Sequence, residues 1–203
     1  ATSNYKGIVK TAECITQPDQ VIDVMRRAFH NIKNGRPGPV VVEVPADISS
    51  SQISFDINSY KPPTKAYHAP SNSDISKAVE KLLTAKNPLI VAGQGVLFSR
   101  STKQLQKLAE MINVPVYTTM PGKSAINETH PLSLGSGVQT TTLQARKWLD
   151  ESDVILALGT SMTNTPYAQS IDTSNKFLIH NTDNYDDINK DHYADVILNG
   201  DTK

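Results

Sequence analysis

Glycines and hydroxyl residues recur directly after apolar, strand-like stretches of this chain. They form four groups, Gly93-Gln94-Gly95, Thr118-Thr119-Met120, Leu134-Gly135-Ser136-Gly137 and Gly159-Thr160-Ser161. Because glycine has no Cβ, the backbone at such positions can approach a phosphate closely, and anions favour bare backbone N–H groups. Each group alone is typical of an ordinary turn. Together the four predict a crevice that binds an elongated, nucleotide-like ligand.

Other chemistries find less support in the residue patterns. The dinucleotide fingerprint GxGxxG needs a third glycine where this chain has Phe98, and neither GxSxG nor GxxxxGK[ST] occurs. Cys14 has no nearby histidine or cationic cluster that would make it a nucleophile. The histidines lack the spacing of a metal site and are predicted to be structural or exposed: His30, His68, His130, His180 and His192.

An acidic run near the C-terminal end could be mistaken for a calcium site. Asp183, Asp186, Asp187 and Asp191 lack the glycine and the terminal glutamate of an EF-hand loop, so we interpret them as a solvated helix face. The sequence therefore predicts no catalytic and no metal-ligating residue.

The composition restricts the partners and the compartment. The 203 residues carry 20 basic and 20 acidic side chains, a net charge of +0, and no clustered Lys or Arg, which argues against nucleic acid and anionic membranes as partners. A single cysteine excludes an internal disulfide and predicts a reducing, cytoplasmic environment. The chain opens at Ala1 without an initiator Met or a leader, which predicts a segment excised from a longer protein.

The first third of the chain is expected to contain one helix and one strand. Apolar residues at helical spacing predict a helix over 18–33, closed by Asn34-Gly35. A β-branched run bounded by prolines predicts a buried strand over 40–44. Residues 49–71 have no periodicity and collect Ser, Asn and Pro, so they are interpreted as a linker.

From Ser73 onward helices and strands alternate. Ser73 is predicted to cap the first helix, and Ser101 with Gln104 has the spacing of a capping box for the second. A third helix is expected over about 138–150 and a helical turn over about 184–191. Strands are expected over 89–92, 114–118, 154–158, 177–180 and 195–198. This βαβ alternation predicts a Rossmann-like α/β domain with a mostly parallel sheet and helices on both faces.

Several strings resemble one family of enzymes. GRPGPVVVEVPAD at 35–47 resembles the end of the pyrimidine-binding domain of thiamine-diphosphate-dependent enzymes of the acetolactate synthase type. PLIVAGQG at 88–95, VPVYTT at 114–119, SDVILALG at 152–159 and ADVILNGD at 194–201 resemble the central domain of the same family.

The resemblance implies a division into parts. Residues 1–48 would be the last helix and strand of the pyrimidine-binding domain, 49–71 a linker, and 72–203 the central domain, a three-layer, DHS-like NAD/FAD-binding fold with a six-stranded sheet. The glutamate that activates thiamine diphosphate and the motif that holds Mg²⁺ and the diphosphate would lie in other parts of the full-length protein. Those parts, the pyrimidine- and diphosphate-binding domains, would be the partners of this chain in a homodimer or homotetramer.

The resemblance also implies a nucleotide site that holds FAD or ADP, or is empty, in different relatives. Arg36 matches an arginine that reaches the nucleotide's phosphates, although an interdomain salt bridge is an equal alternative. The other positions that match the site are Gly93, Gln94, Gly95, Thr118, Thr119, Leu134, Gly135, Gly159 and Asp183.

Several positions depart from the flavin-binding pattern. Ala46 stands where some relatives carry lysine, and 159–165 lacks both arginines of the GxRFDDR-like stretch. Ser136 and Gly137 replace the usual histidine of the glycine loop. At 179–188 both usual aspartates are replaced, and Asp183 lies between them. These changes remove cationic groups that would bind a diphosphate, so a vestigial or empty nucleotide site is an alternative.

Three hypotheses follow. The leading one is a fragment of a thiamine-diphosphate enzyme that decarboxylates a 2-oxo acid, inactive by itself and serving as scaffold. The second is a non-catalytic module that binds ADP or FAD. The third, weakened by Phe98, is an NAD-dependent enzyme on the fold of deacetylases and deoxyhypusine synthase.

Overall fold

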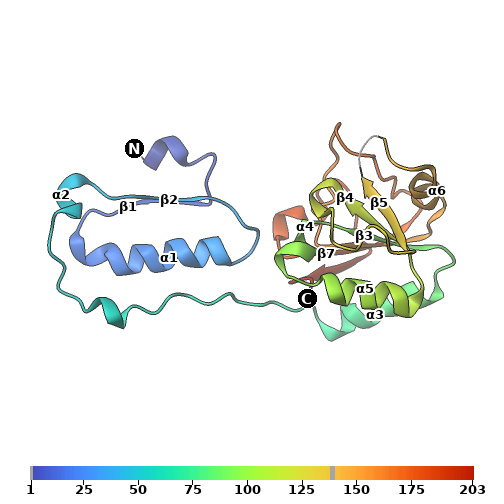
Figure 1. Cartoon of the computed structure of the whole chain (residues 1–203), viewed down its shortest axis with the longest axis horizontal. Coiled ribbons are helices and arrows are strands. Elements are labelled where there is room, and N and C mark those ends of the chain that lie inside the picture. Colours follow the sequence, from blue (N-terminus) through green and yellow to red (C-terminus); the bar gives the residue numbers. More distant parts are fainter. Residues whose placement is uncertain (1, 138–139) are drawn as a thin grey trace. The chain divides into compact units, whose positions relative to one another are not determined.

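The computed structural model describes residues 2–137 and 140–203 and divides the chain into two compact units, with the boundary after Ala66 (Figure 1). This boundary falls within the segment interpreted above as a linker. The two units are described separately below.

The first unit is a helix packed on a pair of parallel strands. Strand β1 (Thr11–Cys14) pairs with β2 (Val40–Glu43), and α1 (Val21–Lys33) connects them. The remaining elements are short: η1 (Thr2–Tyr5), η2 (Pro18–Gln20), α2 (Ala46–Ser49) and η3 (Ile57–Ser59). The helix predicted over 18–33 is therefore a 3-10 turn followed by α1, and β1 was not predicted.

The first unit has a small core. Ile15, Val24 and Ala28 are its buried apolar residues. The Arg27 guanidinium donates to the Glu13 carboxylate at 2.6 Å and so links α1 to β1. Both side chains of this pair are partly exposed, so solvent screening keeps its contribution to stability small.

The second unit is an α/β domain built on six strands, all parallel. Their order across the sheet is β5-β4-β3-β6-β7-β8. The strands are β3 (Pro88–Ala92), β4 (Val116–Thr119), β5 (Ser133–Gly137), β6 (Val154–Leu158), β7 (Phe177–Thr182) and β8 (Val196–Asn199). The helices are α3 (Asn72–Thr84), α4 (Gln94–Phe98), α5 (Thr102–Ile112) and α6 (Leu143–Glu151), with the 3-10 turns η4 (Met120–Gly122) and η5 (Tyr185–Asp187).

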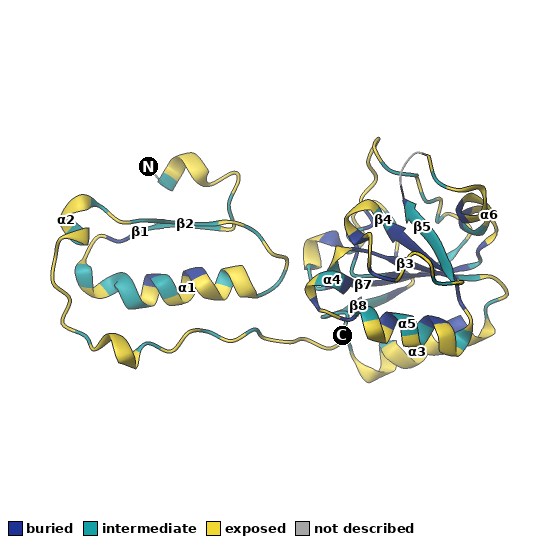
Figure 2. Cartoon of the chain, in the orientation of Figure 1, coloured by how far each residue is buried: buried dark blue, intermediate teal, exposed yellow. Residues whose placement is uncertain are grey.

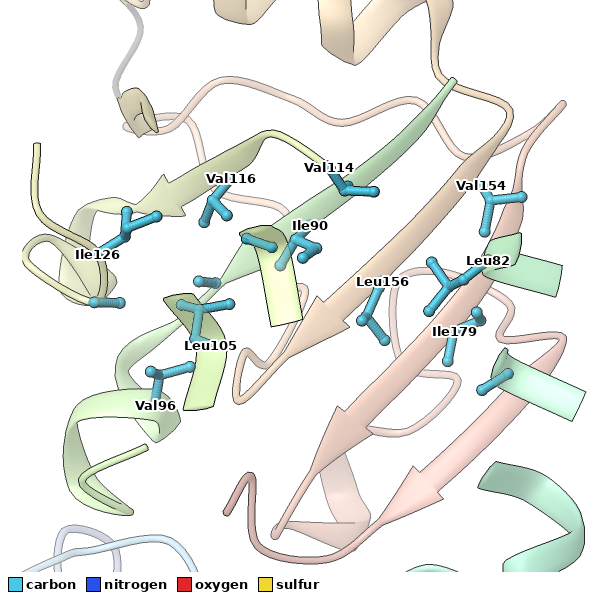
Figure 3. Packing of buried hydrophobic residues seen from close by; sticks show 14 of the residues in the cluster. Leu82, Ile90, Val96, Leu105, Val114, Val116, Ile126, Val154, Leu156 and Ile179 are labelled. Carbon is cyan, nitrogen blue, oxygen red and sulfur yellow. The ribbon is translucent and has the colours of Figure 1, made fainter. Parts of the chain in front are cut away.

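Successive residues of a strand point to opposite faces of the sheet. In this sheet, the side chains on both faces are buried. Ile90 of β3 lies in one cluster with Leu82 of α3 and Leu105 of α5, as the close view shows (Figure 3). Ala92 of β3 belongs to the same cluster. Leu89 and Val91 pack with α6 on the other face. Buried residues concentrate in these central strands (Figure 2). The predicted three-layer α/β fold is confirmed, and the sheet is parallel throughout the described strands.

Two capping predictions are wrong. The Oγ of Ser71, not of Ser73, accepts the N–H of Asp74 at 3.2 Å and caps α3. Ser101 does precede α5, but its side chain caps nothing. Its hydroxyl lies 2.8 Å from Ser99 Oγ instead, because both serines are buried in the tight turn between α4 and α5.

Two glycine-rich segments also differ from the predictions. Residues 134–137, interpreted as a glycine loop, lie in edge strand β5 (Ser133–Gly137), whose backbone pairs with β4 from Val116 to Thr119. Gln94 and Gly95, interpreted as a turn, begin helix α4. The helix expected over 138–150 is α6, which begins at Leu143; residues 138 and 139 lie outside the described part of the chain.

Candidate functional site

The order of the strands places one reversal point in the sheet. From β3 the chain runs outward through β4 to β5, and then returns to the other side of β3 to form β6, β7 and β8. Ala92 and Leu158, near the carboxyl ends of β3 and β6, are paired neighbours. Ligands of open parallel sheets bind at the carboxyl ends beside such a reversal point, so the segments that follow β3, β4 and β6 are the candidates.

The predicted glycine turn makes a close backbone contact at this point. A Cβ on Gly93 would lie 2.3 Å from the Gly159 carbonyl oxygen, and one on Gly95 would lie 2.6 Å from Gly159 Cα. The N–H of Gly93 donates to Leu158 O at 2.8 Å and that of Gly95 to Gly159 O at 2.8 Å. Glycine is required here by the packing of backbone on backbone. These two N–H groups already have acceptors, so a phosphate would have to displace those bonds.

The hydroxyl pair at the end of β4 also makes its hydrogen bonds within the fold. Thr118 is buried, and its Oγ1 lies 3.2 Å from Gly135 O and 3.0 Å from Ser136 Oγ, across to β5. Thr119 Oγ1 accepts the N–H of Gly122 at 3.2 Å and thereby caps η4.

The remaining predicted site residues are placed by different elements. Leu134 and Gly135 lie in edge strand β5, and Gly159 directly follows β6. Asp183 follows β7 and is half-buried. Arg36 is exposed in the turn that precedes β2 of the first unit. The assignment of these residues to a nucleotide stays a prediction.

One residue that the sequence reasoning missed joins three of the strand ends. Asn181 accepts the Gly159 N–H with its carbonyl oxygen at 3.0 Å and with its Oδ1 at 3.2 Å. Its Nδ2 donates to Leu198 O at 2.9 Å and to Gly200 O at 3.0 Å. The available signal was an amide side chain at the end of a strand expected to be buried, because a buried amide needs hydrogen-bond partners.

A cavity of about 330 Å³ lies beside these strand ends. It is lined by residues from the ends of β4 and β5, from η4, and from the connection 159–176, which contains no helix or strand, together with His192. Three of the four glycine and hydroxyl groups that predicted a crevice line it, through Thr119, Met120, Gly137, Thr160 and Ser161. Of the residues matched to a nucleotide by the family resemblance, Thr119 lines it. The sequence did not single out Tyr117, which lies inside strand β4, or Met162 and Asn164, which lie in a connection without periodicity; all three line the cavity.

Polar contacts hold the cavity-forming connection in place. His180 is 1% exposed, and its Nε2 lies 2.8 Å from Thr160 O. Asp191 Oδ2 accepts the N–H of Asn164 at 2.9 Å. The His192 ring lies 3.2 Å from Asn164 Oδ1 and 3.0 Å from Thr173 Oγ1.

Burial shifts the proton affinity of two side chains at the site. It lowers the pKa of His180, and this effect outweighs the opposing hydrogen bond to Thr160 and the attraction of the Asp187 carboxylate. Burial also raises the pKa of Tyr117, an effect that Thr141 offsets in part. His180 is therefore a neutral side chain and Tyr117 a protonated phenol at neutral pH.

The acidic run does not form a solvated helix face. Its helical part is only the 3-10 turn η5, and Asp187 at the end of that turn is buried. Asp191 binds the backbone of the connection 159–176, as described above. Within residues 2–137 and 140–203, no group of three or more His, Cys, Asp or Glu side chains could hold a metal ion.

Among the described residues, no helix is both long enough and apolar enough to cross a lipid bilayer.

The second unit matches a family model over residues 75–203, that of the thiamine pyrophosphate enzyme, central domain. The chain is 36% identical to a Methanococcus aeolicus protein named "Probable acetolactate synthase large subunit", over 98% of this chain and 34% of that protein. It is 37% identical to the glyoxylate carboligase of Escherichia coli O157:H7, over 78% of this chain and 27% of the carboligase.

A solved structure has the same fold. A protein from Mycobacterium smegmatis, described as "a putative thiamin diphosphate-dependent enzyme", superimposes with a TM-score of 0.80 over 99% of this chain and 38% of its own, at 19% identity. The chain thus spans about a third of the length of the proteins that it matches.

Proposed function

Since this chain belongs to the thiamine pyrophosphate enzyme family through its central domain, we propose that it is part of an enzyme that decarboxylates a 2-oxo acid and transfers the remaining fragment. The observation that carries this proposal is the similarity to an acetolactate synthase large subunit over 98% of the chain, which includes the first unit as well as the central domain.

The cofactors of this reaction would bind outside the chain. Thiamine diphosphate would supply the electron sink for decarboxylation, and Mg²⁺ would anchor its diphosphate. The described residues do not fit that role, because they contain no cluster of metal-ligating side chains, and Gly200-Asp201-Thr202 offers one carboxylate. The proposed role of the chain is a scaffold, with the pyrimidine- and diphosphate-binding domains as its partners in a homodimer or homotetramer.

The scaffold role agrees with how the polar groups at the strand ends are used. Asn181 joins the ends of β6, β7 and β8, and Thr118 joins β4 to β5. These side chains hold the carboxyl edge of the sheet rigid. A rigid edge would keep flanking domains in a fixed geometry, which catalysis between domains requires.

The test uses the full-length protein with thiamine diphosphate and Mg²⁺. We expect release of CO₂ from pyruvate or glyoxylate and formation of a carboligation product, both dependent on thiamine diphosphate. The 203-residue chain assayed in the same way should be inactive. Full-length protein that turns over neither acid would contradict the proposal.

FAD or ADP binding by the central domain is the finer part of this proposal. It is supported by the position of Gly93, Gln94, Gly95, Thr119 and Gly159 at the reversal point of the sheet. Calorimetric titration of the 203-residue chain with each nucleotide tests it. If Arg36→Ala weakens nucleotide binding, the result would support the phosphate contact implied for Arg36. If neither nucleotide gives a binding heat, the proposed role of the central domain is reduced to that of a scaffold.

A further inference from the structure

The chain contains two Asn-Gly pairs, Asn34-Gly35 and Asn199-Gly200. In such a pair the backbone nitrogen of the glycine can attack the side-chain amide of the asparagine, because glycine has no Cβ that hinders the approach. The two pairs lie in different surroundings, and the structure therefore distinguishes their reactivity.

The second pair is held in an unreactive geometry. Asn199 is the last residue of β8 and pairs with Thr182 of β7. Gly200 is buried, and its N–H donates to Thr182 O at 3.0 Å. An added Cβ on Gly200 would lie 2.6 Å from His68 O, so the backbone here is closely packed. The nitrogen of Gly200 cannot turn toward the side chain of Asn199 while the sheet is intact.

The first pair lies in the turn between α1 and β2 (Figure 1), where the glycine is not held. Among residues 2–137 and 140–203 no acceptor is found for the Gly35 N–H, and nothing lies within 4 Å of an added Cβ. Asn34 is extended, with ψ 143°, so the peptide between Asn34 and Gly35 must turn before its nitrogen reaches the side chain. Gly35 has φ +64°, a conformation that glycine leaves and enters at little cost.

The side-chain amide of Asn34 is positioned by hydrogen bonds. Its Nδ2 donates to His30 O at 2.9 Å, and its Oδ1 accepts the N–H of Ala66. When a nucleophile adds to Cγ, negative charge develops on Oδ1. A backbone N–H at this oxygen stabilises that charge, as the donors of an oxyanion hole do.

Lys10 can activate the attacking nitrogen. Its Nζ donates to Asn34 O at 2.8 Å and to Asn31 O at 2.7 Å, at the C-terminal end of α1. Asn34 O belongs to the same peptide group as the nitrogen of Gly35. An ammonium group at this oxygen therefore stabilises the deprotonated peptide, which is the form that attacks. The flexible side chain of lysine can follow the carbonyl as the peptide turns.

We propose that Asn34 is a self-modifying site, at which Lys10 activates the nitrogen of Gly35 for attack on the Asn34 side chain. A bond forms between Gly35 N and Asn34 Cγ, and the bond between Cγ and Nδ2 breaks. The amide nitrogen leaves as ammonia and takes the proton of the Gly35 N–H. Water then adds to one of the two carbonyl groups of the resulting succinimide ring and opens it to aspartate or isoaspartate at position 34.

The product differs from Asn34 in charge and in backbone. It carries a negative charge two residues before Arg36, where it would repel a phosphate that Arg36 bound. Isoaspartate also adds a methylene carbon to the main chain, which changes the turn between α1 and β2. The modification itself does not depend on the proposed function, because no cofactor or substrate takes part in it. Decarboxylase activity of the full-length protein and modification at Asn34 can therefore fail separately.

The experiment compares the two Asn-Gly pairs in one sample. The 203-residue chain is kept at neutral pH and physiological temperature, digested at mildly acidic pH, and followed by mass spectrometry through the gain in mass when OH replaces NH₂. We expect Asn34 to react at least about ten-fold faster than Asn199, since only Asn34 can reach the attacking geometry. In guanidinium chloride the two pairs should react at similar rates. Equal rates in the folded chain would overturn the proposal.

Variants of two lysines test the activation. Lys10→Met keeps the apolar stem and removes the ammonium group, and it should slow the reaction of Asn34 about three-fold or more. Lys6→Met makes the same change at an exposed lysine and should leave the rate unchanged. Lys10→Gln keeps a donor for Asn34 O without the charge and should slow the reaction less than Lys10→Met does. An unchanged rate in both Lys10 variants, with circular dichroism like that of the wild type, would refute the assignment.

Asn34→Gln identifies the reacting side chain. The gain in mass should disappear from the peptide that contains position 34, because the longer side chain of glutamine would have to close a larger ring. The slow reaction of Asn199 should continue unchanged in this variant. A gain in mass that persists in the peptide around position 34 would contradict the site.

Discussion

At the scale of single residues, the glycines at the strand ends are fixed by their neighbours. Gly93 and Gly95 touch the backbone of Gly159, and Gly159 itself has φ +58°, in the left-handed region. The sequence predicted glycine turns at all of these positions from their place after apolar runs. It could not indicate that the contact is between two backbones, because Gly159 lies far from Gly95 in the chain and pairs with it only in the folded sheet.

Replacing either glycine of the β3 turn by alanine should destabilise the protein strongly. The added Cβ of Gly95→Ala would lie 2.6 Å from Gly159 Cα, a contact that backbone cannot easily relieve. We expect a loss of at least about 2 kcal/mol in the free energy of unfolding, as for an overpacked core. Urea titration measures it. Gly7→Ala is the control, since nothing lies within 4 Å of its added Cβ and it should change stability by less than about 0.5 kcal/mol.

His180 should make stability depend on pH in a predictable direction. Burial lowers its pKa in the folded state, so below about pH 6.5 the unfolded chain binds a proton that the folded chain resists. The free energy of unfolding should therefore fall as the pH decreases from about 7.5 to 5.5. This contribution should disappear in His180→Gln.

The control for that measurement is His68→Gln, at an exposed position. It should retain the wild-type dependence of stability on pH. A His180→Gln profile parallel to that of the wild type would show that another group causes the change.

At the scale of elements, periodicity predicted the buried parts of the second unit and failed at its edge. Strands β3 and β6 and the first half of β7 are runs of apolar residues buried on both faces, and their sequence indicates this directly. Strand β5 reads Ser-Leu-Gly-Ser-Gly, which has little strand propensity, and it is a strand only because its backbone pairs with β4. Strand β1 was missed for a related reason, since Thr-Ala-Glu-Cys lacks a β-branched run.

Glycine and hydroxyl residues at the strand ends predicted a crevice here, but the sequence could not indicate which other residues would line it. Its walls come from β4, β5 and η4 and from the connection 159–176, segments that the pairing of distant strands brings together. Thr119 was identified from its place at a strand end, whereas Tyr117, two residues earlier, appeared as one more residue of a buried strand. Its place at the cavity becomes visible only in the folded sheet.

The structure and the sequence prediction assign the N-cap of α3 to different residues. Ser71→Ala removes the acceptor of the Asp74 N–H and should lower stability by about 1 kcal/mol. Ser73→Ala, at the position that the sequence favoured, should cost clearly less. Thermal or urea unfolding of both variants decides between the two residues. A larger effect of Ser73→Ala would mean that α3 begins later than described.

At the scale of the whole molecule, the segment that joins the two units should be the first site of proteolysis. Residues 60–71 contain no helix or strand, and Lys65 is the trypsin site in this segment that no proline follows. We expect trypsin to cut first after Lys65 and to leave a stable fragment that begins at Ala66. Mass spectrometry of a digestion time course identifies the first cut.

The matched control is Lys65→Gln, which should slow the first cleavage without changing the thermal stability of the second unit. Digestion of both proteins in urea should proceed at many sites and at similar rates. First cleavage inside α3, α5 or α6 would contradict the division after Ala66.

The central position of β3 in the sheet affects how the chain folds during its synthesis. On the ribosome β3 emerges before every other strand of its sheet, yet one of its edges is completed only by β6, after α5, β4, β5 and α6 have been synthesised. Parallel pairing of such distant segments is slow, and an uncovered strand edge attracts other chains. The nascent domain thus keeps an adhesive apolar edge during most of its synthesis, and a chain whose translation stops before Val154 would be a strong substrate for chaperones.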